Sequence, residues 1–505
     1  MRTAYDAVPY PGNPFFQTHP DRLATIGTLF GMTPAPVDRC RVLELACGDG
    51  GNLIPMAFSL PGSQFVGIDL AGSAIDKGQT LIDTLGLTNI ALKRMDIMDV
   101  AREMCEFDYI IAHGLYSWVP GEVRGKILAI CKSNLTAQGI AFVSYNTYPG
   151  GHLRDPLREM MRFHVRNTSE AEEQIKQAKE LLEFLIDGHP ADDAYGISLR
   201  AEIKSFLERK PQHLYHDELA EHNARLYFYD FVESVKRCGL QCLGESRLAS
   251  MQGGVYPKPV AERLSRFTGD DFLLREQYLD FVKLRKFRQT LLCHENVALD
   301  RTPTPDRVMS FSAATQVRPS SREPDIRSSA PEKFEFSDGG DMTTNHPLGK
   351  AALIHLGRVW PDSVPISALI QVARADSGRD TSAEAAALED DSRWMYNLAW
   401  KLYAAGLLEL YTHPPKLKRT VSQRPVASSL ARAQARQGHS VTNLRHGKID
   451  LEDQTTRRLL ILLDGTRDQN QLLAQLRETA GGTQISIDEL ETNLRHCAEL
   501  ALLTA

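Results

Sequence analysis

The sequence lacks long apolar runs and any cysteine pattern that would hold a metal ion. No stretch approaches the roughly 18 to 20 consecutive apolar residues that a membrane-spanning helix needs, and residues 1–20 contain no apolar segment typical of a secretory signal. The eight cysteines form no C-x-x-C pair, and no histidine completes a set around Cys238 and Cys242. We therefore expect reduced thiols in a cytoplasmic protein, with no structural metal and no membrane segment.

The sequence also lacks a strong excess of either charge. It contains 58 lysines and arginines against 64 aspartates and glutamates, which gives a net charge of −6. Bulk charge therefore does not indicate a nucleic-acid partner. The length of 505 residues exceeds what one hydrophobic core supports, so several domains are expected.

Short apolar runs alternate with amphipathic stretches between residues 41 and 146. The pattern predicts strands at 41–46, 64–69, 89–94, 107–112 and 139–145, and helices near 51–60, 72–85 and 122–134. Alternation at this spacing is typical of an α/β fold, a doubly wound and mostly parallel sheet with helices on both faces. An amphipathic helix at 227–238, followed by Gly239 and an apolar run at 240–244, predicts a late additional strand.

The rest of the chain changes in composition several times. We predict a first domain over 1–250 with a helical insertion at about 151–212, and a helical middle region over 251–300. Residues 301–345 are rich in Pro, Ser, Thr, Asp and Arg, and they predict a disordered linker. Residues 346–505 predict a winged-helix-like C-terminal domain. The basic residues between 283 and 288 are expected on a solvated helix face, namely Lys283, Arg285, Lys286 and Arg288.

The segment VLELACGDGGN at 42–52 joins a buried strand to a glycine-rich turn and a helix that starts near Asn52. Gly48 and Gly50 allow the backbone to turn tightly and a ligand to lie against it. The turn alone would suit a dinucleotide as well. Glu44 lies on the strand itself, however, and an acid there suits a cationic group, such as the amino group of S-adenosyl-L-methionine, better than a pyrophosphate.

Two further acids follow the next two strands. Asp69 closes the second strand, where a carboxylate accepts both hydroxyls of a ribose, and Asp96 follows the third, where methyltransferases hold the adenine amine. Singly, either acid is explained as a helix cap. Jointly they lie at the sheet edge where ligands bind. The predicted S-adenosyl-L-methionine site comprises Glu44, Ala46, Gly48, Gly50, Asn52, Asp69, Leu70, Asp96, Ile97 and His113.

The residues after the fourth and fifth strands are expected to face the transferred methyl group. Candidates for the catalytic side are His113, Tyr116, Trp118, Tyr145, Asn146 and Tyr148. An aromatic face stabilises a sulfonium, but Tyr116 and Trp118 are equally explained as packing under the next helix. His113 is either a base or a partner of the backbone. The aromatic and proline-rich segment at 5–20 predicts an extended arm, as a lid or as a packed strap.

Four long stretches resemble a known family: residues 5–31, VLELACGDGGNLIPMAF at 42–58, residues 216–246, and DFVKLRKFRQTLLCHE at 280–295. They are similar to bacterial methyltransferases that carry a methyltransferase regulatory domain, a family that includes lysine methyltransferases of outer-membrane proteins. The resemblance implies a class I methyltransferase core, an inserted helical region that can dimerise, and a middle and a C-terminal domain. Ala46 departs from the general motif, which often has glycine.

These observations favour methyl transfer from S-adenosyl-L-methionine to an amine, such as a lysine of an outer-membrane or surface protein. A small-molecule methyltransferase is the alternative within the enzyme class. From another class, the tail would make the chain a DNA- or protein-binding regulator with a vestigial methyltransferase core. Residues 382–403 carry more acid than base, which argues against DNA. We therefore expect a protein substrate, a possible homodimer, and neither nucleic acid nor membrane as a partner.

Overall fold

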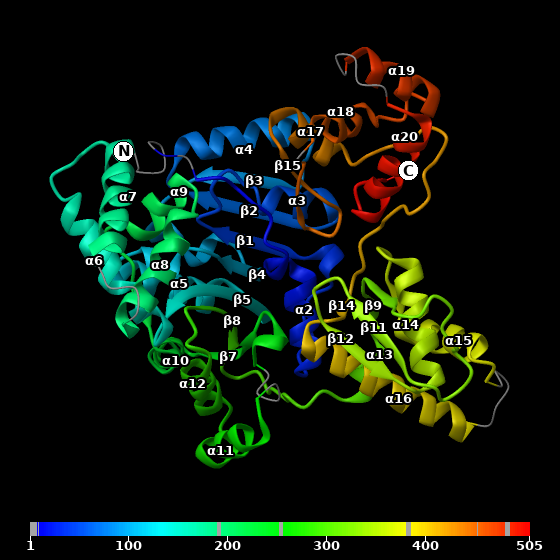
Figure 1. Cartoon of the computed structure of the whole chain (residues 1–505). Coiled ribbons are helices and arrows are strands. Elements are labelled where there is room, and N and C mark those ends of the chain that lie inside the picture. The colour runs from blue at the N-terminus through cyan, green and yellow to red at the C-terminus, as the bar shows by residue number, and fades with distance from the viewer. Residues whose placement is uncertain are drawn as a thin grey trace.

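The chain builds one large sheet with a helical insertion and two C-terminal units beside it in the computed structural model (Figure 1). The structure describes residue 8 and residues 10–188, 193–251, 256–379, 385–451, 453–479 and 485–504. Tyr5, which belongs to the arm expected from the sequence, lies outside these ranges. Within them, no helix combines the length and the apolar character needed to cross a bilayer.

The large sheet is doubly wound and mostly parallel, as the sequence predicts. Its main path runs β3-β2-β1-β4-β5-β8-β7, and β1 to β5 are mutually parallel. These strands are β1 (Arg41–Leu45), β2 (Gln64–Asp69), β3 (Ile90–Arg94), β4 (Phe107–Ala112), β5 (Leu135–Thr147), β7 (Leu240–Glu245) and β8 (Phe287–His294). The short β6 (Arg225–Leu226) pairs with the end of β5.

Helices cover both faces of the sheet. Successive apolar side chains along each strand point to opposite faces, so each face has its own buried core. One core joins the sheet to α2 (Pro20–Leu29), α3 (Leu53–Ser59) and α4 (Gly72–Leu85). The other joins it to α5 (Gly121–Asn134) and α10 (Phe228–Arg237). The parallel strands end at one edge, which is where the loops after β1, β2, β3 and β4 gather.

The region 251–300 is only partly helical, which corrects the sequence-based expectation. It contains α11 (Lys258–Thr268) and α12 (Phe272–Lys283), but then forms β8, antiparallel to both β5 and β7. Leu291, Leu292 and Cys293 are fully buried in that strand. The strand β8 is hard to recognise in the sequence because it begins with basic residues. Arg288 is a buried core residue and does not belong to a solvated helix face.

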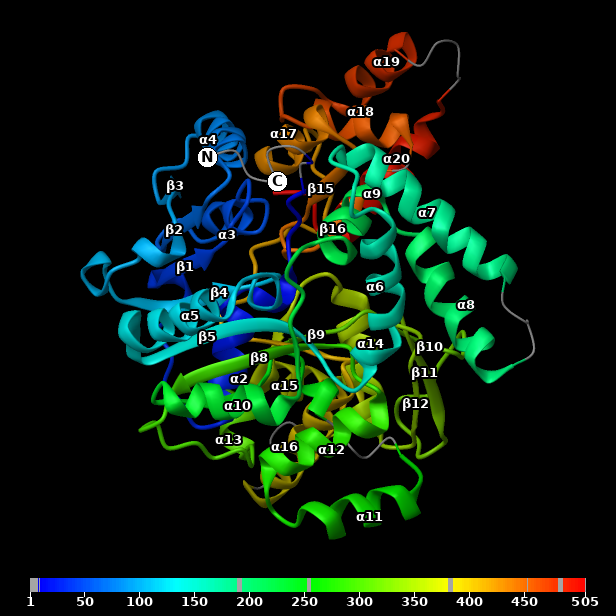
Figure 2. The same cartoon turned by 90° about the vertical axis from the view of Figure 1, so that its left-hand side faces the viewer.

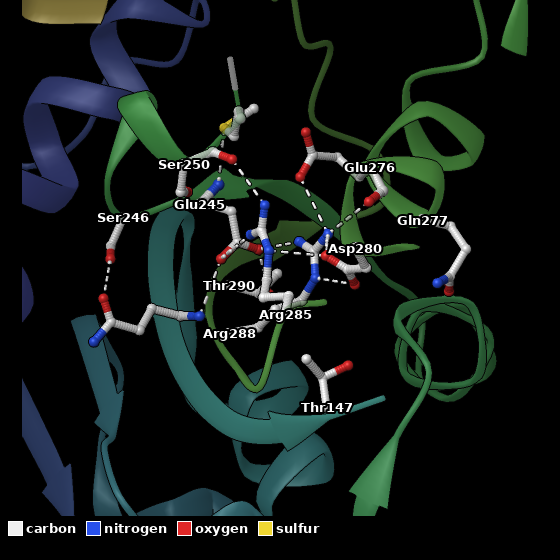
Figure 3. Close-up of polar contacts among 12 residues, drawn as sticks. Thr147, Glu245, Ser246, Ser250, Glu276, Gln277, Asp280, Arg285, Arg288 and Thr290 are labelled. Atoms are coloured by element: carbon white, nitrogen blue, oxygen red, sulfur yellow. Dashed lines mark hydrogen bonds and ion pairs between the residues drawn. The ribbon is translucent and has the colours of Figure 1, made fainter. Parts of the chain in front are cut away.

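Arg288 lies at the centre of a buried ionic cluster (Figure 3). It donates to Glu245 at 2.7 Å, to Asp280 at 2.8 and 2.9 Å, and to the Glu276 carboxylate at 3.2 Å, and its guanidinium lies 3.8 Å from the centre of the Phe228 ring. Despite burial, Arg288 lowers the pKa of Glu245, whereas burial raises that of Glu276. The cluster fastens β8 to β7 and α12.

The insertion forms a helical unit with its own core, as expected. It contains α6 (Asp155–His164), α7 (Ala171–Gly188) and α8 (Ala194–Leu207). The unit stands at the side of the sheet, away from β3 (Figure 2). Large apolar side chains remain exposed on or next to these helices, namely Leu153, Phe163, Phe184, Tyr195 and Ile197.

Residues 301–345 are ordered, so the predicted disordered linker is wrong. They form α13 (Pro305–Met309), β9 (Ser312–Ala314), β10 (Val317–Pro319), β11 (Glu332–Phe336) and β12 (Asp341–Thr344). Phe311, Phe334 and Phe336 are buried, so few apolar residues suffice for strands this short. The polar loop between β10 and β11 is held by the buried Lys350, which donates to the carbonyls of Ser328 at 2.7 Å and Ala330 at 3.0 Å.

The C-terminal part consists of two helix-and-strand units. The first comprises α14 (Pro347–Val359), β13 (Val364–Pro365), α15 (Ile366–Asp376), α16 (Ala385–Ala405) and β14 (Glu409–Tyr411), and it shares a core with the large sheet. The second comprises α17 (Ser429–Gln437), β15 (Ser440–Thr442), β16 (Lys448–Asp450), α18 (Gln454–Leu462), α19 (Gln469–Thr479) and α20 (Ile487–Glu499) around a separate core. In Figure 1 this second unit lies next to α3 and α4.

Candidate active site

The turn after β1 takes an unusual backbone path. Ala46, Gly48 and Gly50 all have positive φ, at 59°, 56° and 71°. Glycine adopts this region without strain, whereas alanine does so at a cost. A Cβ at residue 50 would also lie 3.0 Å from the side chains of Ile54 and Leu92. The left-handed backbone at Ala46 explains why glycine is common at that position of the motif.

Glu44 is a buried acid that pairs with no cation among the described residues. Its Oε1 accepts a 2.7 Å hydrogen bond from Asn52 Nδ2, whereas Oε2 has no hydrogen-bond partner among the described residues. Burial, followed by the neighbouring Asp69 and Asp49, raises the pKa of Glu44 to about 8, and the bond from Asn52 only partly opposes this. A buried carboxylate with a free oxygen fits an ammonium group, which would restore its charged form.

Asp69 and Asp96 lie at the carboxyl ends of β2 and β3. Asp69 accepts from the backbone N–H groups of Gly48 and Ala71, each at 2.8 Å, and so links the turn after β1 to β2. Asp96 is exposed and accepts from Met98 N at 2.9 Å, so one of its oxygens is a helix cap. Leu70 is 51% exposed and Ile97 is buried. Together with Glu44, these carboxylate acceptors fit the ammonium, the ribose hydroxyls and the adenine amine of S-adenosylmethionine.

His113 follows β4 and is held by Ser144 of β5. Ser144 Oγ accepts from Gly114 N at 2.8 Å and lies 3.1 Å from His113 Nδ1. The contact between His113 Nδ1 and Ser144 Oγ orients the ring, and the donor in it depends on the tautomer of His113. Burial lowers the pKa of His113 to about 4, so the ring is neutral. The Phe15 ring lies 4.0 Å away, centre to centre.

Tyr116 and Tyr145 do not face this edge, which corrects the expectation from the sequence. Both are buried beneath α10, where Tyr145 stacks on Phe231 at 4.1 Å and Tyr116 meets the same ring edge-on at 5.4 Å. The Tyr145 hydroxyl lies 3.2 Å from that of Thr290. Alternation along β5 places Tyr145 on the opposite face from Ser144. The packing explanation therefore holds for Tyr116, while Trp118 is half-buried.

Asn146 and Tyr148 are half-buried near the end of β5. Asn146 Nδ2 donates to Asn223 Oδ1 at 2.9 Å, and its backbone N–H donates to Ser117 Oγ at 2.8 Å. Tyr148 stacks on His152 at 3.9 Å, and its hydroxyl donates to Asp155 at 3.1 Å. Sequence reasoning missed Asn223, because no motif joins it to a residue 77 positions earlier.

The N-terminal arm lies across the turn after β1. Phe15 N donates to Asn52 Oδ1 at 2.9 Å, and the arm continues into α2. Its other end contacts the residues after the insertion, where the Tyr10 hydroxyl lies 2.9 Å from His213 Nδ1. The arm thus contacts the turn directly, as either a lid or a packed strap would.

A pocket of about 310 Å³ opens at the same sheet edge, beyond β5. It is lined by Gln17, Glu245, Arg247, Ser250, Arg285, Phe287 and Gln289. The Phe287 ring lines this pocket and lies 6.4 Å from the His113 ring, centre to centre. No sequence motif indicates this pocket, because its walls depend on the unexpected strand β8.

Three family models match separate parts of the chain. The model "Methyltransferase domain" matches residues 42–139, "Predicted methyltransferase regulatory domain" matches 210–294, and "PKMT, C-terminal winged helix domain" matches 423–502. The chain is 34% identical over 454 residues to the uncharacterized protein RP789 of Rickettsia prowazekii, across 88% of this chain and 80% of that protein. It matches the structure of PKMT2 from Rickettsia typhi with a TM-score of 0.88 and 30% identity, over 98% of this chain and 100% of that one.

The chain belongs to the PKMT family of S-adenosylmethionine-dependent methyltransferases. A second structure of PKMT2 from Rickettsia typhi, in complex with AdoHcy, matches with a TM-score of 0.86 and 29% identity over 98% of this chain. S-adenosylmethionine is thus the cofactor of this PKMT-family chain. The segment matched by the regulatory-domain model contributes β7 and β8, so it completes the large sheet.

Proposed function

We propose that this PKMT-family enzyme methylates an amine, namely a lysine side chain of a protein. The carrying observation is the state of His113. Burial lowers the pKa of the ring to about 4, so the ring is neutral, and its Nδ1 lies 3.1 Å from Ser144 Oγ. Such a histidine is a poor base toward the acceptor. A neutral amine attacks without help from a base, whereas a hydroxyl needs one. The likeness to PKMT2 over the whole chain supports a protein lysine.

We propose that Glu44, Asp69 and Asp96 hold the ammonium, ribose and adenine of the cofactor. Ala46, Gly48, Gly50, Asn52, Leu70, Ile97 and His113 complete this proposed site. Bound S-adenosylmethionine supplies a methyl group on a sulfonium. With the cofactor bound, the amine lone pair would form the N–C bond as the S–C bond breaks, AdoHcy would leave, and the methylated ammonium would release a proton to water. We propose that the half-buried Trp118, Asn146 and Tyr148 orient the acceptor amine toward the methyl group.

We propose that the acceptor reaches the methyl group past Phe287, over the pocket at the end of β7 and β8. The proposed acceptor is a lysine of an outer-membrane or surface protein, modified in the cytoplasm. Exposed apolar side chains on the insertion, such as Phe184 at 67% exposure, support a homodimer through α6 to α8. We also propose that residues 1–250 together with β8 carry catalysis and that 346–505 contact the protein acceptor.

The acceptor class is tested with S-adenosylmethionine labelled in its methyl group and a lysate from the source organism. Label in protein, recovered as methyl-lysine after hydrolysis, is the expected outcome. Asp69→Ala serves as the inactive control. Label confined to small molecules would overturn the protein acceptor, and methyl-arginine or a methyl ester in place of methyl-lysine would overturn the lysine.

A further inference from the structure

The second C-terminal unit reaches the turn after β1 through one histidine. His446 lies in the turn between β15 and β16, and its Nε2 lies 2.9 Å from Asn52 Oδ1, across 394 positions of sequence. The side chain is buried, with 5% of the residue exposed. Its backbone has a φ of 59°, which is uncommon for a residue other than glycine. A strained conformation in a buried contact points to a role for that contact.

The hydrogen bonds around Asn52 determine which way its amide points. Phe15 N can only donate, so the atom that it contacts at 2.9 Å is the carbonyl oxygen. The amide nitrogen then faces Glu44 Oε1 at 2.7 Å and Thr18 Oγ at 3.0 Å. His446 is the second strong donor to the oxygen, which requires a proton on Nε2. Its Nδ1 has no partner among the described residues.

The turn that carries His446 is held in place from two sides. Arg445 Nη1 donates to the carbonyl of Pro361 at 2.6 Å, and its guanidinium lies 4.1 Å from the centre of the Trp360 ring. Asn443 Oδ1 accepts from Gly447 N at 2.7 Å inside the turn. Contacts within the second C-terminal unit and contacts with the first unit therefore fix the turn that carries the His446 imidazole.

We infer that His446 is a positioning residue of the methyl-donor site: by donating to Asn52 it keeps the amide nitrogen on Glu44 Oε1 and leaves Glu44 Oε2 directed at the cofactor's ammonium. The inference rests on the proposed role of Glu44. It makes the winged-helix part of the chain a component of the cofactor site. Burial, which lowers the pKa of His446 to about 3, keeps the ring a single-proton donor throughout the neutral range.

A purely structural contact between domains predicts a different result. In that case any side chain that fills the space of His446 has the same effect. A variant then loses cofactor affinity only to the extent that the folded protein loses stability. If His446 orients Asn52, AdoHcy affinity depends on whether the side chain at residue 446 places a hydrogen-bond donor close enough to Asn52. Glutamine places its amide nitrogen near the position of the imidazole Nε2. Asparagine tolerates the left-handed backbone better than other residues except glycine but is too short to reach Asn52.

The test compares His446→Gln, His446→Asn and His446→Ala in the full chain. Binding of AdoHcy is measured by calorimetry, because this readout needs no acceptor, and unliganded melting temperatures are recorded beside it. His446→Asn and His446→Ala are expected to weaken AdoHcy binding at least tenfold, and His446→Gln to stay within threefold of the parent. His496→Ala, an exposed position on α20, is the matched control.

Two results overturn the inference: parent-like binding by His446→Asn, or binding by His446→Gln as weak as that of His446→Ala. Glu44→Gln separates this failure from that of the proposed site. If Glu44→Gln binds AdoHcy normally, the assignment of Glu44 fails. If Glu44→Gln loses affinity while the His446 variants do not, only the role of His446 fails. In the double variant Glu44→Gln/His446→Ala, the two losses are expected not to add, because both act through one carboxylate.

Discussion

Gly51 lies directly against Gly12, so the turn after β1 and the N-terminal arm touch through two residues without side chains. A Cβ on Gly51 would lie 2.6 Å from the carbonyl carbon of Gly12, and backbone would have to move. The arm also brings Phe15 onto His113. The arm and the turn after β1 therefore pack so closely that neither glycine leaves room for a Cβ.

Gly51→Ala is expected to displace the arm while the turn keeps its shape, because Gly51 has no positive φ. The arm should become more sensitive to limited proteolysis, and AdoHcy should bind at least several-fold more weakly. Gly125→Ala on α5 is the matched control, since a Cβ there meets nothing within 4 Å. Unchanged proteolysis and binding in Gly51→Ala would rule out a lid.

Cofactor binding is expected to strengthen as pH rises toward 8. The Glu44 carboxyl has a pKa of about 8 in the free protein, so it is mostly protonated at pH 7. An ammonium favours the ionised form, so binding releases a proton, and affinity rises by up to about tenfold per pH unit below 8 before it levels off. Calorimetry of AdoHcy at pH 6.5, 7.5 and 8.5 measures this slope. Glu44→Gln should remove the slope and lower the plateau; a slope that persists in the variant would point to another group.

Ala46→Gly is expected to stabilise the protein by about 1 kcal/mol, because alanine is strained at this left-handed position. The greater freedom of glycine in the unfolded chain offsets part of the gain. Chemical denaturation measures the difference. Gly50→Ala is the opposite experiment, since it adds both strain and a 3.0 Å contact, and it should lower stability. A loss of stability in Ala46→Gly would contradict the strain.

Arg288→Leu should cost about 3–5 kcal/mol of stability, because it leaves buried carboxylates without their cation. Arg318→Leu provides the control. Arg318 makes an exposed ion pair with Glu335 at 3.0 Å, and exposed pairs contribute at most about 1 kcal/mol. Urea denaturation of both variants compares the two. Equal effects would show that the cluster around β8 does not hold the sheet together.

The sequence predicts local structure well wherever a pattern is local. The bounds predicted for β2, β4 and α4 agree with the structure, because strand and helix periodicity are read from neighbouring residues. β8 is missed because Arg288 looks like a surface residue until Glu245, Glu276 and Asp280 surround it. Tyr145 is misplaced because one register step decides between the pocket and the core. His446 and Asn52 belong to no common motif.

The position of β8 between β5 and β7 has a consequence for synthesis of the chain. β5 is complete at residue 147, but its antiparallel neighbour begins only at residue 287. At ordinary elongation rates the edge of β5 stays unpaired for on the order of ten seconds. The short β6, which pairs with the end of β5 from residue 225 onward, is the first segment to cover part of that edge. A nascent chain released before residue 294 would expose a central strand to pairing with other chains.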